Sequence, residues 1–532
     1  MNNKDIFFTP KIISDYFIEL TQKAHPSGGE DPLRQWVIKK VSAIQNKYTD
    51  NRGKVQVKFY HPEAKEPDER IIFLQRKGAN LYADKLPVIL QAHLDMVAVP
   101  GEKIFPLKLD KYTENNITWL RALKDLAHPE KGGTTLGADD GIGVATILSV
   151  LEEETLQDMP LECLFTVQEE TDMASARNFD VNLLTGSKFI NLDAADLKVI
   201  IYGSAGGCAS VYKRKVACRE SMESSQIFRI SVSGLKSGHS GADINKGRQN
   251  AIKIITDILV RLNGRINRID AAGRINSYDL LLHTINRTDR VVQNSIPAEA
   301  QAVVSVPVAQ ADNFVEDINK LLDLTRAANM PVEDQFSASV RVADSKELPM
   351  TAACTDSVLL LLKQLPHGVI SMIPARPGLV ETSTNLFDVV ICDGELQIRS
   401  FNRSSNIEAL SCLNNIQMNM ARCFGFEPTI NIDHFPLWQP DDSSELLKIA
   451  KSVYQKIYGP EAEATVIHAG LECGWIIERC GTKVECISIG PTIQDLHSEN
   501  ERLQLEDNGI NTIESYYHAV LKIILNSFTG AR

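Results

Sequence analysis

Residues 87–95 read PVILQAHLD, an apolar run that ends in a histidine and an aspartate. Two later apolar runs also end in acidic residues: LECLFTVQEE at residues 161–170 and KFINLD at residues 188–193. Near-continuous apolar runs are typical of buried parallel strands, and α/β proteins place their sites at the carboxyl ends of such strands. The pattern predicts an α/β sheet whose strand ends carry a functional site.

The region before residue 207 alternates between strand and helix patterns. Helical spacing runs from Lys11 to about Val41, with a turn at His25–Gly29, and short strands are expected at residues 54–60, 70–77 and 87–95. A helix and two further strands are expected after the glycine-rich segment at residues 137–143. Such alternation indicates a mostly parallel sheet with helices on both faces.

The 532-residue chain is too long for a single core. After Gly203–Gly207, strands such as QIFRISVSGL alternate apolar and polar residues, as half-buried antiparallel strands do. The α/β pattern returns after residues 436–440. We therefore expect a catalytic domain in two parts, residues 1–207 and 435–532, interrupted by an inserted α+β lid domain at residues 208–434. The order of elements in this insertion fits one or two α+β units.

Composition excludes several classes of protein. The net charge of −12 argues against a nucleic-acid-binding protein, which is usually basic. No apolar stretch approaches the roughly 18 residues of a membrane span, and the N-terminal residues lack the pattern of a signal peptide. None of the ten cysteines forms a C-x-x-C pair, which favours reduced thiols. We expect a cytoplasmic protein that binds neither nucleic acid nor membrane.

The pair His93 and Asp95 places two side chains on one face of a strand. An acid at this spacing can hydrogen-bond the second nitrogen of a metal-bound histidine and fix its orientation. An ordinary hydrogen bond at the end of a strand explains the pair equally simply, and this reading is favoured for the pair alone.

Asp139 and Asp140 form a glycine-flanked acidic pair just before an expected helix. Glycines permit tight backbone geometry, and a carboxylate held there can bridge two cations. The alternative is that Asp140 caps the helix, which is a common role for aspartate. Both roles are compatible, with Asp139 on metal and Asp140 shaping the turn.

Glu169 and Glu170 end an apolar strand. Adjacent carboxylates in an apolar setting repel each other unless a cation neutralises them. If Glu170 binds metal, Glu169 is free to remove a proton from water. A solvated turn is the alternative.

The remaining candidates are single residues that carry little signal alone. His239 lies between two glycines, and Arg399 could hold a carboxylate through two parallel hydrogen bonds. A glycine-punctuated loop after a strand offers His468 and Glu472. The other single candidates are Asp193 and His497.

Eight segments, in this order, resemble the di-zinc peptidases of the carboxypeptidase-G and aminoacylase group. They are most similar to the aminoacyl-histidine dipeptidases (Xaa-His dipeptidase, peptidase D). The segments are AHLDMV (92–97), TTLGADDGIGVA (134–145), EETDMASA (169–176), NLD (191–193), GLKSGHSGADI (234–244), NSIPAEA (294–300), HAGLECG (468–474), and SIGPT with HS (488–492 and 497–498). Each segment is a weak signal, and their common order makes the resemblance strong.

The resemblance implies a zinc metallopeptidase that hydrolyses dipeptides, of the Xaa-His type such as β-Ala-His, and that forms a homodimer. It implies two Zn²⁺ per chain, which Co²⁺ or Mn²⁺ can replace. Asp139 would bridge both ions and be joined to Asp140 by a cis peptide bond. The other implied ligands are His93 and Asp193 for one ion, and Glu170 and His497 for the other.

The resemblance also implies the remaining roles. Glu169 would be the general base, Asp95 would orient His93, and His239 would stabilise the oxyanion. The substrate-binding residues would be Arg399, Asn294, His468 and Glu472. A nearby second arginine, Arg403, leaves the carboxylate-binding residue ambiguous. The competing functions are a related di-zinc tripeptidase, carboxypeptidase or N-acyl amino acid amidohydrolase, and a scaffold protein without metal.

Overall fold

The computed structural model describes residues 6–52, 70–98, 105–128, 132–220, 224–266, 276–374 and 376–530. The strand expected at residues 54–60 lies outside these ranges. The chain divides into two compact units. The first comprises residues 1–203, 440–466 and 471–532, and the second comprises residues 204–439 and 467–470. The second unit begins four residues before the expected insertion and ends five residues after it, and it also takes in the short segment 467–470.

A seven-stranded sheet forms the centre of the first unit, in the order β1-β6-β2-β7-β19-β8-β18. The four strands β6, β2, β7 and β19 are parallel, whereas β1 and β8 pair antiparallel with their neighbours. The expected mostly parallel sheet is therefore confirmed, with antiparallel additions. The strands are β1 (Ile72–Arg76), β2 (Val88–His93), β6 (Leu161–Thr166), β7 (Lys188–Asn191), β8 (Val199–Ser204), β18 (Glu463–Ile467) and β19 (Glu485–Ser488).

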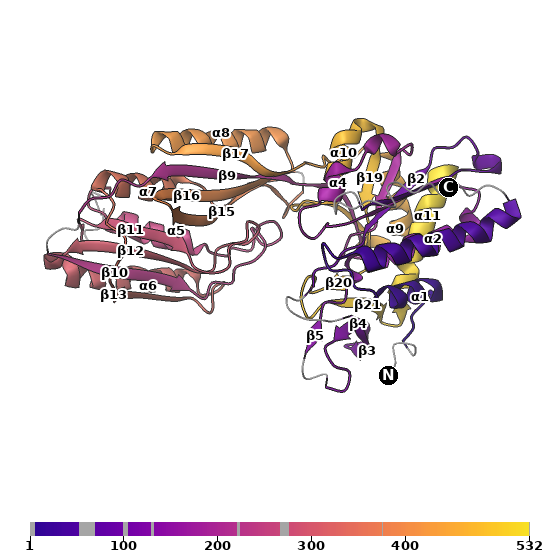
Figure 1. Cartoon of the computed structure of the whole chain (residues 1–532), viewed down its shortest axis with the longest axis horizontal. Helices are drawn as coiled ribbons and strands as arrows, with labels where there is room; N and C mark the ends of the chain where they lie inside the picture. The colour runs from indigo at the N-terminus through magenta and orange to yellow at the C-terminus, as the bar shows by residue number, and fades with distance from the viewer. Residues whose placement is uncertain are drawn as a thin grey trace. The chain divides into compact units, whose positions relative to one another are not determined.

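Helices cover this sheet (Figure 1). Helix α3 packs between β2 and α1, and buries side chains on all its faces. Helix α1 buries Ile13, Phe17 and Leu20, which share one face because they are three or four residues apart. Helix α9 packs against α11 and β19. The helices of this unit are α1 (Lys11–Leu20), α2 (Asp31–Arg52), α3 (Ala138–Glu152), α4 (Ala174–Asn178), α9 (Glu445–Tyr458), α10 (Glu472–Cys480) and α11 (Thr512–Thr529).

A second, smaller sheet in this unit was not expected from the sequence. It has the order β20-β21-β4-β3, with β5 and β22 added at β4 and β21. Its strands are β3 (Lys108–Glu114), β4 (Ile117–Leu123), β5 (Gly133–Thr134), β20 (Ile493–Gln494), β21 (Arg502–Asp507) and β22 (Ile510–Asn511). Pairing of β4 with β21 joins the early and late parts of the chain just beside residues 494–501.

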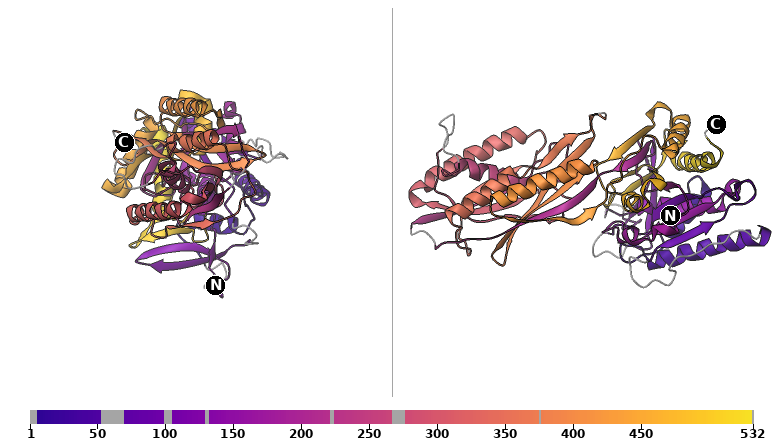
Figure 2. Two further views of the ribbon diagram at one scale, coloured as in Figure 1. Left: turned by 90° about the vertical axis from the view of Figure 1, so that its left-hand side faces the viewer. Right: turned by 90° about the horizontal axis from the view of Figure 1, so that it is seen from above.

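The second unit contains two antiparallel sheets, in keeping with the α+β pattern of the sequence. Helices α5 and α6 pack on the four-stranded sheet β11-β12-β10-β13. Helix α8, orange in Figure 2, lies along the five-stranded sheet β14-β15-β16-β9-β17. The strands are β9 (Gly206–Lys215), β10 (Ser225–Ser233), β11 (Leu281–Arg287), β12 (Ala300–Pro307), β13 (Ser337–Val342), β14 (Gly368–Met372), β15 (Val380–Cys392), β16 (Glu395–Ser404) and β17 (Glu427–Phe435). The helices are α5 (Ala251–Leu262), α6 (Ala311–Asn329), α7 (Ala352–Gln364) and α8 (Ile407–Cys423).

All ten cysteines are free thiols, and five of them are buried. None of the helices in the described parts of the chain has the length and apolar character needed to cross a membrane.

Candidate metal centre and active site

The carboxyl ends of three neighbouring strands bring most of the candidate residues together. His93 is the last residue of β2, Glu169 and Glu170 follow β6, and Asp193 follows β7. Because β2 pairs in parallel with both β6 and β7, these ends meet at one edge of the sheet. The site therefore lies where α/β sheets commonly bind ligands.

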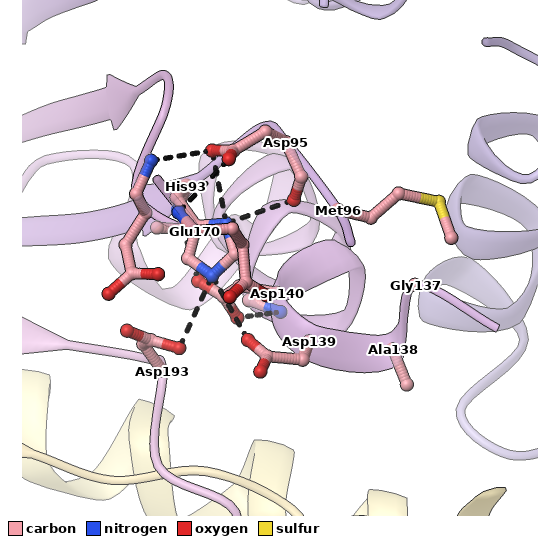
Figure 3. A network of polar contacts seen from close by, with 12 residues as sticks. His93, Asp95, Met96, Gly137, Ala138, Asp139, Asp140, Glu170 and Asp193 are labelled. Carbon is pink, nitrogen blue, oxygen red and sulfur yellow. Dashed lines mark hydrogen bonds and ion pairs between the residues drawn. The ribbon is translucent and has the colours of Figure 1, made fainter. Parts of the chain in front are cut away.

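Asp139 and Asp140 enter this edge from the start of α3. Both residues have non-helical backbone angles, and the peptide bond between them is cis. The Asp140 carboxylate accepts hydrogen bonds from the backbone N–H groups of Gly143 (3.1 Å) and His93 (3.2 Å). The expected capping role of Asp140 is thus observed, and its carboxylate is committed to the backbone. The Asp139 side chain points instead towards the His93 imidazole (Figure 3).

The Asp139 carboxylate lies between two histidines. Its Oδ1 atom is 3.0 Å from His93 Nε2, and its Oδ2 atom is 3.2 Å from His497 Nε2. Asp193 Oδ1 lies 3.4 Å from His93 Nε2, and Glu170 Oε2 lies 2.9 Å from His497 Nε2. Five residues thus form two groups, each with one imidazole and one further carboxylate, that share Asp139.

Asp95 holds the strand ends in place. Its two carboxylate oxygens accept hydrogen bonds from the backbone N–H groups of Glu169 (2.9 Å) and Glu170 (3.1 Å), and a third comes from the Ser27 hydroxyl (2.9 Å). His93 Nδ1 lies 3.0 Å from the Asp95 backbone oxygen and 3.5 Å from its carboxylate. The backbone oxygen is therefore the nearer partner of the imidazole, and the carboxylate chiefly positions the Glu169–Glu170 segment.

Crowding of acids in a buried place dominates the electrostatics of the site. Burial raises the pKa of Asp193 to about 7, aided by Asp139 and opposed by His93. Burial also raises the pKa of Glu169 well above its usual range, with Asp193 and Glu170 adding to the effect. Against the effect of burial, hydrogen bonds from His497 and His93 lower the pKa of Asp139. Cations at this place would relieve the repulsion between the carboxylates.

The donor set fits divalent metal ions. Imidazole nitrogens and carboxylate oxygens are ligands that Zn²⁺ accepts. Glu170 Oε1 is buried and has no hydrogen-bond partner among the described residues. The donor atoms of Asp139, Glu170 and His497 lie within 4.8 Å of one another. The donor atoms of His93, Asp140 and Asp193 also lie within 4.8 Å of one another. Asp139 is nevertheless the better third ligand beside His93 and Asp193, because the Asp140 carboxylate already accepts two backbone N–H groups.

Glu472 begins α10 and is fully buried beside the same strand ends. Its Oε2 atom accepts hydrogen bonds from Gln91 Nε2 and the Thr166 hydroxyl, both at 2.6 Å, whereas its Oε1 atom has no partner among the described residues. Burial raises the pKa of Glu472 to about 8. Glu472 was expected in a loop, and the structure instead places it at the start of a helix.

The second unit gathers three other predicted residues: His239, Asn294 and His468. Ser240, next to His239, donates its backbone N–H to the backbone oxygen of Asn294 (2.7 Å). His468 Nε2 lies 2.7 Å from the Ser383 hydroxyl oxygen. The His468 backbone oxygen packs closely against Gly241, because a Cβ atom added there would lie only 2.4 Å from it. Burial, with Arg403 and His239 contributing, lowers the pKa of His468 to about 3.

The two arginines of β16 have different surroundings. The side chain of Arg399 is 36% exposed and lies 3.4 Å from the Asp388 carboxylate. Arg403 is 3% exposed and donates to the Asn294 side-chain oxygen (3.0 Å). Within the described ranges no carboxylate pairs with Arg403, and its Nε atom is buried without a partner. Burial lowers its pKa to about 10, so the guanidinium stays charged at neutral pH.

The two arginines are four residues apart on one strand, a separation of about 13 Å. Arg403, and not Arg399, is therefore the arginine that belongs to the cluster around Asn294 and His468.

One residue at the metal centre was missed by the sequence analysis. Glu501 accepts hydrogen bonds from the backbone loop that carries Asp139. Glu501 lies in a polar segment after His497, where no apolar pattern predicts a buried side chain. Its position four residues after a predicted metal ligand was the single feature of the sequence that pointed to a role at the site.

Known proteins resemble this chain in sequence and in fold. Residues 89–522 match the model of Peptidase family M20/M25/M40. The cytosol non-specific dipeptidase of Escherichia coli (strain K12) is 28% identical over 508 residues, which cover 94% of this chain and 95% of that protein. The crystal structure of aminoacylhistidine dipeptidase from Vibrio alginolyticus superposes with a TM-score of 0.77 at 25% identity, over 99% of each chain.

A tripeptidase from Staphylococcus aureus has the same fold, with a TM-score of 0.52 at 15% identity over 98% of this chain and 100% of that one. The family match spans most of the chain and includes all five predicted metal ligands and Glu169. The chain belongs to Peptidase family M20/M25/M40 and is a metallopeptidase.

Proposed function

We propose that this protein hydrolyses the peptide bond of dipeptides by means of two divalent metal ions bound around Asp139. The observation that carries the proposal is the position of the Asp139 carboxylate, with one oxygen facing His93 and the other facing His497. A carboxylate that faces two imidazoles, each beside a further carboxylate, supports a pair of closely spaced metal ions of the kind that two-metal hydrolytic sites use. The family to which the chain belongs supports the same reaction class.

We assign one metal ion to His93 and Asp193, and the other to Glu170 and His497, with Asp139 as the shared ligand. The proposed ions are two Zn²⁺ per chain, and Co²⁺ or Mn²⁺ would be accepted in their place because the donor atoms are the same. When bound, two such ions polarise the scissile carbonyl group and lower the pKa of the attacking water.

Glu169 is the proposed general base. Its backbone N–H donates to the Asp95 carboxylate (2.9 Å). Its carboxylate lies within 4.8 Å of donor atoms of His93 and Glu170, but it belongs to neither of the two groups that share Asp139. Burial and the neighbouring acids raise the pKa of Glu169 well above its usual range. A carboxylate with a raised pKa removes a proton from water more readily and can return it to the leaving amine. The proton that Glu169 takes up thus leaves with the product.

The second unit supplies the proposed substrate-binding groups. Arg403 is a buried cation with no carboxylate partner among the described residues, and such a charge is costly to bury unless an anion joins it. We propose that this anion is the free carboxylate of the dipeptide. Arg399, whose charge faces Asp388, is a weaker candidate. The earlier roles for His239 as oxyanion donor, and for Asn294, His468 and Glu472 in substrate binding, stay predictions.

Substrate preference is proposed from the relatives. The names of two of them, a cytosol non-specific dipeptidase and an aminoacylhistidine dipeptidase, support dipeptides and, more narrowly, Xaa-His dipeptides such as β-Ala-His. The first name also supports the predicted cytoplasmic location. The predicted homodimer and the predicted absence of nucleic-acid and membrane partners stay predictions.

A substrate panel tests the proposal. We expect purified protein loaded with Zn²⁺ to hydrolyse β-Ala-His, Ala-His and other dipeptides, and to lose this activity on chelation. Tripeptides and N-acyl amino acids are the matched comparisons, because the related tripeptidases and amidohydrolases would prefer them. Faster hydrolysis of either class than of every dipeptide would replace the proposed function with that alternative. A protein that binds no metal and hydrolyses none of these compounds would support the scaffold alternative.

A further inference from the structure

The Glu501 carboxylate binds four consecutive backbone N–H groups of one loop. Its Oε2 atom accepts from Leu136 (2.8 Å) and Gly137 (3.2 Å), and its Oε1 atom accepts from Ala138 (2.8 Å) and Asp139 (3.5 Å). Glu501 itself is 3% exposed. One buried side chain therefore accepts from every backbone N–H group of residues 136–139, the segment that presents Asp139.

The shape of this loop explains why an anion is needed. Gly137 has a positive φ of 68°, and the N–H groups around such a turn converge on one point, where they favour a negative charge. Buried N–H groups without an acceptor are costly. Because both oxygens of Glu501 are used, an amide side chain could replace only one of the two acceptors.

Glu501 also belongs to the segment that carries the other end of the site. His497 lies four residues earlier, with a left-handed backbone (φ 60°), and the Glu501 N–H donates to the Ser498 oxygen (3.2 Å). The carboxylate thus connects two chain segments, one holding Asp139 and the other holding His497.

We propose that Glu501 is a positioning residue that fixes Asp139 and His497 at the separation in which they bind metal together. The inference rests on the proposed function, since it takes these two residues as metal ligands. Groups outside the ligand shell that orient ligands typically contribute about 10–100-fold to metal affinity. We expect a change of that size in the metal dissociation constant when the Glu501 contacts are altered.

Glu162 provides a matched control. It is fully buried and accepts the backbone N–H groups of Thr185 (3.0 Å) and Gly186 (3.1 Å). It lies near the start of β6, whereas Glu170 follows the end of that strand. Glu162→Gln therefore alters the same kind of contact, a buried carboxylate that accepts neighbouring backbone N–H groups (here called a carboxylate clamp), at the opposite end of the strand from the site.

The experiment measures Zn²⁺ binding to the metal-free full-length protein by competition with a coloured chelator. Assays at pH 8 keep Glu501 ionised, because burial and Asp139 raise its pKa to about 7. We expect Glu501→Gln to weaken Zn²⁺ binding about 10–100-fold and Glu162→Gln to leave it unchanged. Excess Zn²⁺ should restore most of the kcat of Glu501→Gln, which a catalytic role for Glu501 would not allow. Unchanged Zn²⁺ affinity in a folded Glu501→Gln protein would overturn the proposal, as would equal loss in both variants.

Two further measurements keep the test decisive. If Glu501→Gln does not fold, Glu501→Asp takes its place in the test. Glu501→Asp retains the charge with a shorter reach, so we expect it to bind Zn²⁺ more weakly than the unmodified protein. In the unmodified protein, the N–H groups of residues 136–139 should exchange slowly with solvent even without metal, and rapid exchange would contradict the clamp. If the unmodified protein bound no metal, the proposed function would fail, whereas the exchange data would still report on the clamp itself.

Discussion

Asp139 and His497 lie 3.2 Å apart, between Oδ2 and Nε2, although 358 residues separate them in the chain. The other oxygen of the same carboxylate faces His93, which belongs to the early part of the chain. Asp139 is therefore one of the residues at which the early and late parts of the first unit meet. Substitutions there should affect both proposed metal ions, whereas substitutions of the outer ligands should affect one ion first.

Glu169→Gln should slow catalysis strongly without removing metal. The amide cannot accept the proton of the attacking water, so we expect kcat to fall about 10²–10⁴-fold. Metal content measured by elemental analysis should stay at the level of the unmodified protein. Glu154→Gln, which changes an acid in a short helix after α3, is a suitable control and should retain full activity. A Glu169→Gln protein with normal kcat would refute the assignment of the base.

Arg403→Ala and Arg399→Ala separate the two candidate carboxylate-binding residues. A hydrogen bond to a charged group contributes about 1.5–3 kcal/mol, so Arg403→Ala should raise KM for dipeptides about 10–100-fold. Arg399→Ala should change KM little, because Arg399 faces Asp388 and solvent. The effect of Arg403→Ala should shrink when the substrate carboxylate is replaced by an amide. A larger effect from Arg399→Ala on KM would reverse the assignment.

Removal of metal should lower stability as well as activity. Without cations, the buried acids of the site repel one another or must take up protons, as the raised pKa values of Glu169 and Asp193 indicate. Metal at 100 times its dissociation constant stabilises the folded state by about 2.7 kcal/mol. Chelation should therefore lower Tm by several degrees, and restoring Zn²⁺ should reverse the change. An unchanged Tm would show that no metal binds to the folded protein.

His25 should make the protein sensitive to acid. Its side chain is 2% exposed, and burial lowers its pKa to about 4 from the usual 6.5. Between pH 6.5 and about pH 4, His25 therefore binds a proton in the unfolded chain but not in the folded chain. The contribution of neutral His25 to the unfolding free energy is complete above pH 6.5 and is lost as the pH falls towards 4. The shift corresponds to about 3 kcal/mol.

Urea unfolding of the unmodified protein and His25→Asn between pH 7 and pH 4 checks this expectation. The variant should be less stable at pH 7, because His25 Nδ1 lies 2.7 Å from the Lys23 backbone oxygen. The difference in unfolding free energy between the two proteins should shrink as pH falls. A difference that stays constant across this range would contradict a neutral buried His25.

Most of the central sheet, and the strand ends that carry the candidate site, could be predicted from the sequence because both follow from simple chain geometry. An apolar run that ends in ligand-type residues marks a buried strand with a site at its end, as His93 and Asp193 show. The glycines around Asp139 marked the turn before α3. The resemblance to a known family supplied the pairing of distant ligands, which no local pattern contains.

Other features were not predictable from local pattern. The sheet formed by β3, β4 and β21 depends on pairing between residues nearly four hundred positions apart, and register over such distances leaves no signal in one sequence. Glu501 lies in a polar segment where a buried acid is not expected, since its burial depends on the N–H groups of a distant loop. The different surroundings of Arg399 and Arg403 arise from Asp388 and Asn294, which other strands and loops bring to them.

The position of β19 in the central sheet has a consequence for synthesis of the protein. This strand, residues 485–488, lies between β7 and β8, which end nearly three hundred residues earlier. During translation the first two hundred residues emerge with a gap in their sheet and without His497, whereas the second unit is almost continuous in the chain. Domains generally fold as units while the ribosome delivers them. On the proposed assignment, a nascent chain cannot cleave peptides before both β19 and His497 have been translated, because β19 completes the central sheet and His497 completes the proposed metal centre.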